Sequence, residues 1–91
     1  MVSHMSTTAS AVRGGQIDWG QMRTGIMRAD VVDGVPYVEL MAIYPGGKEI
    51  CVLQGGLPME FPSGNLTLLD VVLRDGEPIV TLRLDSIPIG K

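Results

Sequence analysis

The sequence predicts an all-β fold, a small antiparallel β-barrel or sandwich of roughly six to seven short strands joined by hairpins. Three observations support this prediction. Apolar and polar residues alternate along several short runs, as is typical of half-buried strands, because successive side chains point to opposite faces. The dipeptides Asp33-Gly34 and Asp75-Gly76 separate such runs and strongly favour tight hairpin turns. No run of about ten residues carries apolar side chains at helical spacing.

The clearest hairpin joins residues 66–74 to residues 77–87. Each run has an apolar face, because β-branched and leucine side chains recur at every second position. A two-residue turn at the tip brings these faces together and places Leu69 opposite Leu82.

The other strands are expected, in chain order, at residues 16–19, 23–32, 36–44, 48–54 and 59–61. Gly25 interrupts the second of these and indicates a bulge or a close backbone approach. Residues 33–40 and 75–82 share the pattern Asp-Gly-x-Pro-x-Val-x-Leu. Two interpretations stay open, an internal duplication or the common chemistry of Asp-Gly turns. In both copies the proline has no N–H to donate on the side away from its hairpin partner. We therefore expect no third strand to pair with the hairpin at the position of the proline.

Two strands carry apolar residues on both faces. In residues 37–44, Val38 lies on one face while Met41 and Ile43 lie on the other, and residues 66–74 are similar. A domain of this size has one interior, so the second face needs another cover. A second subunit would supply it, with each large side chain so covered contributing about 1.5–3 kcal/mol. The alternative is that a few exposed apolar side chains need no cover. We expect a homo-oligomer, in its simplest form a homodimer.

A single domain is expected over residues 13–88, because 91 residues make one domain. Residues 1–12 lack periodicity and large side chains, so we expect a disordered leader, in which Ser3, His4 and Met5 resemble a cloning scar. Residues 89–91 are expected to form a tail.

The charge of the chain argues against nucleic-acid and membrane partners. The formal net charge is −3, and the seven Lys and Arg residues are scattered along the sequence. Phosphate backbones and anionic membranes are bound mainly by clustered basic residues. Cys51 is the one cysteine, so no intrachain disulfide forms, and we expect a cytoplasmic protein.

No metal site, cofactor or catalytic residue is predicted, and a non-catalytic role is favoured over an enzymatic one, which stays open. Zinc needs clustered Cys and His side chains, whereas this chain offers Cys51 and, in the leader, His4. Without a histidine base, Cys51 is expected to be a small core residue rather than a nucleophile. Asp70 and Asp85 are expected to form surface ion pairs rather than a catalytic pair.

Aromatic and sulfur-containing side chains are the candidates for a ligand site or an interface, because they form adaptable apolar surfaces. The candidate residues are Trp19, Met22, Met27, Tyr37, Met41, Tyr44 and Cys51. Trp19 either plugs one end of a barrel or, if exposed, acts as a binding hot spot.

These observations favour a small non-catalytic β interaction module that self-associates. One alternative is a small β-barrel that binds an apolar metabolite in its lumen, in the manner of a metal-free, cyclase-like enzyme. Its lumen would be lined by Trp19, Tyr37, Tyr44 and Cys51. Another is a structural subunit whose sheet edges pair between chains.

A weaker pattern runs through the whole domain. It consists of Trp19 with Gly20, the Gly-x-Pro-x-Val-x-Leu run at residues 34–40, Leu53-Gln54-Gly55, Phe61 and the run at residues 80–84. In these glycines and core positions, residues 13–87 resemble small all-β domains of unknown function from actinobacteria. The resemblance implies a compact bacterial β fold and carries over no catalytic residue.

Overall fold

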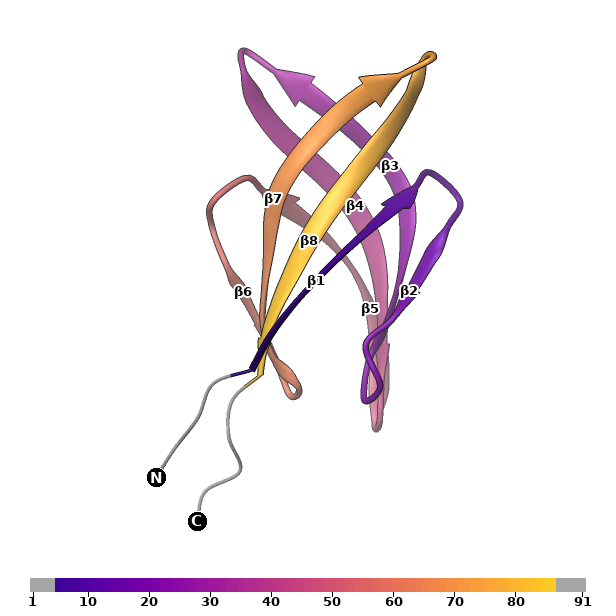
Figure 1. The fold of residues 1–91 in the computed structure, drawn as a ribbon. Helices are drawn as coiled ribbons and strands as arrows, with labels where there is room; N and C mark the ends of the chain where they lie inside the picture. Colours follow the sequence, from indigo (N-terminus) through magenta and orange to yellow (C-terminus); the bar gives the residue numbers. More distant parts are fainter. Residues whose placement is uncertain (1–4, 87–91) are drawn as a thin grey trace.

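The computed structural model describes residues 5–86, and over this range the protein is all-β, as predicted. Its eight strands are β1 Met5–Val12, β2 Gln16–Asp18, β3 Arg23–Val32, β4 Val35–Tyr44, β5 Gly47–Gln54, β6 Met59–Phe61, β7 Gly64–Arg74 and β8 Glu77–Ser86. They form two antiparallel sheets, ordered β1-β8-β7-β6 and β2-β3-β4-β5 (Figure 1). The sheets are separate, so the strands do not close into a barrel. Ser3 and His4 of the predicted scar and the predicted tail at residues 89–91 lie outside the described residues.

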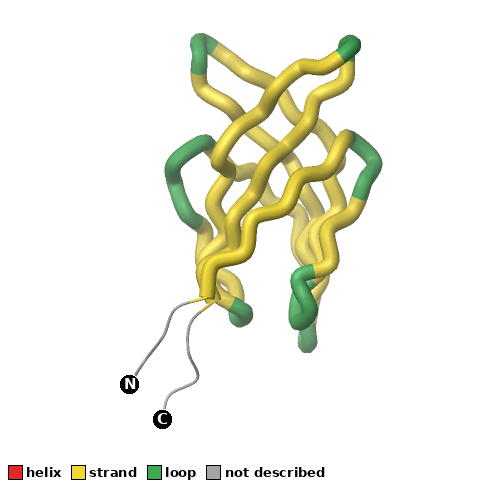
Figure 2. Tube along the Cα trace, in the orientation of Figure 1, coloured by secondary structure: helices red, strands yellow, loops and turns green. Residues whose placement is uncertain are grey.

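The first strand corrects the prediction of a disordered leader for residues 5–12. β1 pairs with β8 over its whole length, from Met5 opposite Ser86 to Val12 opposite Ile79. With β1 the described residues hold eight strands, where six to seven were predicted, and Figure 2 shows them joined by short loops without a helix. β1 escaped prediction because its side chains are mostly small or hydroxylated and therefore give no apolar alternation.

One hydrophobic core lies between the two sheets. Its most deeply buried side chains come from facing strands, with Val38 and Leu40 of β4 and Val80 and Leu82 of β8 all fully buried. The whole cluster consists of Ile17, Met22, Ile26, Val38, Leu40, Ala42, Leu53, Phe61, Leu66, Leu68, Val71, Val80, Leu82 and Leu84. Alternate residues of each strand therefore face inward, as the period-two pattern predicts.

A β-bulge in β7 corrects the predicted register of the β7–β8 hairpin. The pairing shifts between Leu68 and Asp70, so that Leu82 lies opposite Leu68 and not, as predicted, opposite Leu69. The extra residue reverses the alternation of the strand. Leu66 and Leu68 are fully buried, whereas Leu69 is 41% exposed. The sequence pattern assigned Leu66 and Leu68 to one face of β7 and Val71 to the other. Because the bulge shifts the alternation by one residue, all three side chains point into the core.

The β3–β4 and β7–β8 hairpins share one geometry. Asp33 and Asp75 have φ angles of 53° and 54°, and the glycine after each is also at positive φ, the combination found in a type I′ turn. Each hairpin carries a bulge at the same distance from its turn, at Met27 in β3 and at Leu69 in β7. Asp-Gly chemistry accounts for the turns but not for the matching bulges, so the structure favours an internal repeat.

The repeat extends over four strands on each side. Strands β1–β4 correspond in order to β5–β8, and Met5 and Gly47, which begin β1 and β5, are 42 positions apart. The pairing of Ile17 with Thr24 between β2 and β3 recurs between β6 and β7 as Met59 with Leu66. In each unit the first strand pairs with the last strand of the other unit, β1 with β8 and β5 with β4. Two equivalent units thus exchange their first strands.

The two matching prolines limit the third strand of each sheet. The N–H of Gly55 donates to the carbonyl of Pro36 at 2.8 Å, but Pro36 has no N–H to return, and β5 ends at Gln54. β1 likewise ends at Val12, one level before Pro78. This confirms the prediction that no third strand pairs at the level of the prolines.

Candidate functional site

The structure does not bring the seven predicted residues together. Four of them pack in or against the core, namely Trp19, Met22, Tyr44 and Cys51. Tyr37 and Met41 lie on the outer face of β4, and Met27 is the bulge residue of β3. Tyr37 and Tyr44 are seven residues apart in one strand, about 23 Å, and face opposite sides. They therefore do not line a common lumen.

Trp19 has a packing role. Its ring is partly buried against the core, and its indole N–H donates to the hydroxyl of Thr24 at 3.0 Å. Thr24 is fully buried, so this bond gives its hydroxyl a partner inside the core. Of the two alternatives for Trp19, the structure favours the one in which it closes the core over the one in which it is an exposed hot spot.

The candidate thiol is in an environment that keeps it neutral. Burial, and then the nearby charge of Glu49, raise the pKa of the Cys51 thiol above its ordinary value. Glu49 also accepts a hydrogen bond of 3.1 Å from the hydroxyl of Tyr44, and this bond is the main cause that raises the pKa of Tyr44. The Tyr44 ring in turn lies 6.1 Å from the ring of Phe61. A thiol with a raised pKa is a poor nucleophile.

The acidic side chains are engaged in local contacts. Asp70 lies opposite Thr81 and accepts a hydrogen bond from the N–H of Val71 at 2.9 Å. Asp85 forms an ion pair with Arg83 at 3.1 Å. The two aspartates considered as a catalytic pair are therefore separate. Among residues 5–86, no group of three or more His, Cys, Asp or Glu side chains is placed to hold a metal ion.

An apolar surface lies on the outer side of β4 and β5. The register sets Met41 beside Ile50, and Val52 lies next along the same face of β5. Ile50 and Val52 are 54% and 56% exposed, the highest values on this surface. We call it the β4–β5 face, and it consists of Tyr37, Met41, Ile43, Ile50 and Val52.

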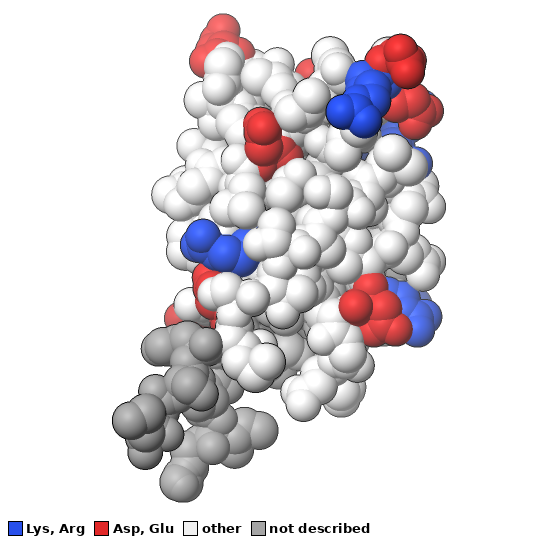
Figure 3. All heavy atoms as spheres, in the orientation of Figure 1, with Lys and Arg blue, Asp and Glu red and all other residues white. Residues whose placement is uncertain are grey.

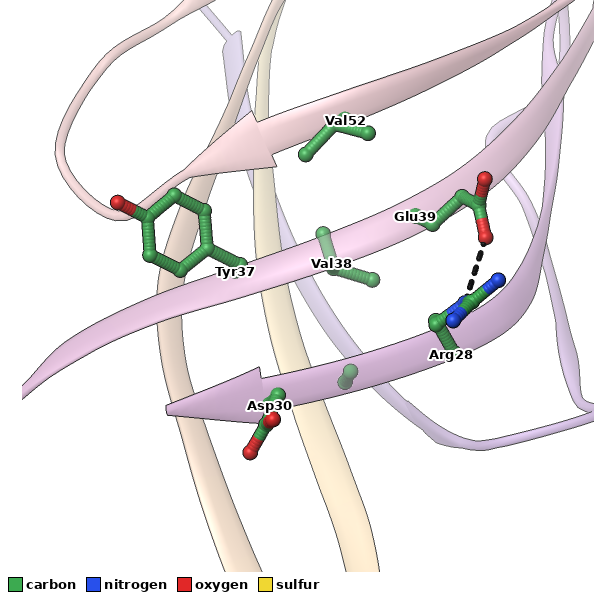
Figure 4. Close-up of a pocket in the computed structure, with 7 residues that line it drawn as sticks. Arg28, Asp30, Tyr37, Val38, Glu39 and Val52 are labelled. Carbon is green, nitrogen blue, oxygen red and sulfur yellow. Dashed lines mark hydrogen bonds and ion pairs between the residues drawn. The ribbon is translucent and has the colours of Figure 1, made fainter. Parts of the chain in front are cut away.

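Shallow hollows flank the β4–β5 face. The first, of about 240 Å³, lies beside Tyr37 and Val52 and is bordered by Arg28 and Glu39, which are joined at 2.9 Å (Figure 4). The second, of about 290 Å³, is lined by Met41, Lys48, Glu49 and Ile50. Both are open and smaller than typical ligand pockets, which suits contact with another protein surface.

Charges are mixed rather than gathered. Figure 3 shows one face on which basic and acidic side chains lie near each other at the margins. On the sheet β2-β3-β4-β5, ion pairs join Arg28 to Glu39 and Arg23 to Asp18. Over residues 5–86 the structure contains no helix with the length and apolar character needed to cross a membrane.

Sequence reasoning named Ile43 among the apolar residues that need cover, but it missed two residues of the β4–β5 face, namely Ile50 and Val52. A signal for them exists in the sequence. The two-residue turn Pro45-Gly46 sets the register of the next hairpin, which places Met41 beside Ile50. Alternation then puts Val52 on the same face as Ile50. They escaped attention because isoleucine and valine are also the ordinary residues of a β core.

Comparison of the chain with protein-family models, with curated proteins and with solved structures finds no match. The resemblance to small actinobacterial domains stays a prediction. Evidence on function therefore comes from the geometry of the described residues, and above all from the β4–β5 face.

Proposed function

We propose that the protein is a non-catalytic interaction module, a two-layer β-sandwich that self-associates through the β4–β5 face. The observation that supports this proposal is a difference between two equivalent surfaces. The repeat of 42 positions assigns to each outer residue of β4 and β5 a counterpart in β8 and β1. The chain therefore contains a reference surface built on the same backbone arrangement.

Four of the five apolar residues of the β4–β5 face have polar counterparts, and the fifth, Tyr37, corresponds to Ile79. In the order Met41, Ile43, Ile50 and Val52, the polar counterparts are Arg83, Asp85, Thr8 and Ser10. The hydroxyls of Ser10 and Thr81 are hydrogen-bonded at 2.9 Å, and Arg83 pairs with Asp85 at 3.1 Å. The same arrangement of strands thus forms at β8 and β1 with a polar outer face. Folding alone does not require apolar side chains on the β4–β5 face, and covering them on association supplies a reason for their presence.

Covering these side chains favours association. Each large apolar side chain moved out of water contributes about 1.5–3 kcal/mol. Loss of translational and rotational freedom costs about 4–15 kcal/mol, so several side chains are needed. A two-fold contact uses the same surface of both copies, which doubles the side chains that Ile50 and Val52 supply.

The groups that could perform chemistry support a non-catalytic role. The raised pKa keeps the Cys51 thiol protonated, and Glu39 and Asp70 are bonded to neighbouring groups. A metabolite bound between the sheets has less support, because Tyr37 and Tyr44 of its predicted lining face opposite sides of β4. The unpaired cysteine favours the cytoplasm as the compartment.

Light scattering on a size-exclusion column, repeated over a dilution series, tests this proposal. We expect a homodimer that dissociates on dilution. The double variant Ile50→Thr/Val52→Ser introduces the residue types of the reference surface and should weaken the dimer at least about tenfold, or about 1.4 kcal/mol.

A matched control exists on the other sheet. Val72 of β7 is 48% exposed and corresponds to Asp30 of β3, so Val72→Asp copies the opposite unit in the same way. We expect this control to leave the dimer unchanged. A wild-type chain that stays monomeric up to about millimolar concentration contradicts the proposal, because such an affinity is below about 4 kcal/mol.

A further inference from the structure

We propose that two copies join edge to edge, by antiparallel pairing of β5 with β5 of a second copy about a two-fold axis at Ile50. The inference rests on the proposed self-association and narrows it to the β5 side of the β4–β5 face, where Ile50 and Val52 meet the second copy. Tyr37, Met41 and Ile43 of β4 then lie on the outer surface of the joined sheet. The pairing would extend the sheet β2-β3-β4-β5 of one copy into the same sheet of the other. The occupant of the open edge is thus a second copy of this chain.

β5 differs from the other edge strands of the molecule. The edge strands β2 and β6 have only three residues each, which leaves little to pair with. β1 has eight residues, as β5 has, but its outer positions carry Thr8 and Ser10 where β5 carries Ile50 and Val52. A long apolar edge without a bulge or a proline invites another strand, and natural proteins seldom leave one open.

The backbone of β5 offers free groups in a regular row. The bond from Gly55 to Pro36 and the β4–β5 register show that odd-numbered residues of β5 face β4. In an antiparallel ladder the alternate residues, Lys48, Ile50 and Val52, then direct their N–H and C=O groups away from β4. Over residues 5–86, no strand other than β4 pairs with β5. A second strand could form hydrogen bonds with this row of N–H and C=O groups.

Side chains favour an axis at Ile50. This register sets Ile50 opposite Ile50 and Lys48 of each copy opposite Val52 of the other. Val52 is flanked in its own sheet by Glu39. Lys48 of the second copy then lies two strands, about 10 Å, from Glu39, a distance that the two long side chains span. Within the described part of one chain Lys48 forms no ion pair, so the second copy would supply its partner.

The neighbouring registers are less favourable. An axis at Glu49 sets two carboxylates opposite each other, and like charges directly opposed destabilise a strand pair. An axis at Cys51 needs the carbonyl of Gln54, which already accepts a hydrogen bond of 3.1 Å from the N–H of Leu57. The axis at Ile50 avoids both conflicts.

Edge pairing also explains which side chains of the β4–β5 face are most exposed. Met41 lies in the central strand β4, where β3 and β5 flank it, and it is partly buried. Ile50 and Val52 have a flanking strand on one side only and are more than half exposed. A second β5 supplies the missing flank.

The variant Val52→Pro tests the backbone pairing. It removes an N–H that points away from β4, and edge strands tolerate proline there. The matched control is Ser10→Pro, at the equivalent position of β1. We expect Val52→Pro to weaken the dimer about 30-fold, since each copy loses one bond across the interface, while Ser10→Pro leaves it intact. Circular dichroism on both variants checks that the fold is retained.

Charged substitutions at Ile50 test the register without altering the backbone. The variants Ile50→Lys and Ile50→Glu should each be monomeric, because like charges meet at the axis. An equimolar mixture of the two should form a heterodimer, which mass measurement detects. Monomeric wild-type protein would overturn the proposed function. A wild-type dimer whose Val52→Pro variant dissociates at the same concentration as the wild type, or whose charged variants do not pair when mixed, would overturn edge pairing alone.

Discussion

The two sheets of this molecule have equivalent frameworks and different outer surfaces. Core positions keep their character in both units, as Leu40 and Leu82 do, and both of these side chains are fully buried. Outer positions do not, since Ile50 in one unit corresponds to Thr8 in the other. Positions at which both units agree are those that folding demands. Positions at which the units differ are free of that demand, and their residues reflect what each surface contacts.

The strongest test of the equivalence is a pair of core truncations. Leu40→Ala and Leu82→Ala each remove a fully buried side chain at matching places in β4 and β8. Each should lower the free energy of unfolding by about 2–5 kcal/mol, through lost burial and the cavity left behind. Urea unfolding at one fixed protein concentration measures both. A difference between the two variants larger than about 2 kcal/mol would mean that the units support the core unequally.

The turns give the next largest effect. Gly34 and Gly76 have φ angles of 79° and 81°, and a Cβ on either would meet nothing within 4 Å. Alanine there costs only backbone strain, about 1–2 kcal/mol in each hairpin.

The control for the turn variants is Gly25→Ala. Gly25 does not have a positive φ, and the nearest atom to its Cβ would be 3.9 Å away. We expect this variant to be neutral or slightly more stable than the wild type. Thermal unfolding that shows the same loss at Gly25 as at Gly34 and Gly76 would refute the strained-turn explanation.

Local turn chemistry made much of this fold predictable from the sequence. The Asp-Gly turns gave both hairpins, and the β7–β8 register is correct from the turn as far as Asp70. The bulge at Leu69 could not be foreseen, because Leu66, Leu68, Leu69 and Val71 are apolar in either phase of the strand. β1 was missed for the opposite reason, since it has too few apolar residues to show a period.

The candidate site was predictable only in part. Aromatic and methionine side chains were chosen for their chemistry, and two of them, Tyr37 and Met41, lie on the β4–β5 face. Four others pack in or against the core, as Met22 does at 2% exposure, and Met27 is the partly exposed bulge residue of β3. Residue type alone does not separate an interface from a core, because both are apolar. Comparing the two units helps to separate them, since four outer positions of β4 and β5 have polar counterparts, whereas core positions such as Val38 and Leu40 keep the same residue in Val80 and Leu82.

Transferring the apolar edge to the other sheet sharpens this comparison. Thr8→Ile/Ser10→Val gives β1 the residues that β5 has at the matching places. Both positions are at the surface, so the free energy of unfolding should change by less than about 0.5 kcal/mol. With two open apolar edges per chain, however, assemblies larger than a dimer should form. Light scattering detects them, and an unchanged mass would mean that apolar edge residues are not sufficient for pairing.

The smallest expected difference between the sheets is in their response to alkaline pH. Cys51 and Tyr44, whose pKa values are raised in the folded chain, correspond to Ala9 and Ser86, which do not titrate. A raised pKa means that the folded state holds its proton longer than the unfolded state does. The stability that each group contributes is therefore complete below its unfolded pKa and is lost as the pH rises through the folded value.

For the thiol this loss begins near its ordinary pKa of 9.0 and for the phenol near 10.0. We expect the free energy of unfolding of the wild type to fall progressively above pH 9. Cys51→Ala should remove the earlier part of this fall, and Tyr44→Phe the later part. Urea unfolding at neutral pH and at several alkaline values, at constant ionic strength, measures the slopes. If Cys51→Ala follows the wild-type curve throughout, the alkaline loss does not come from the thiol, and burial of Cys51 beside Glu49 does not make the two sheets differ in this respect.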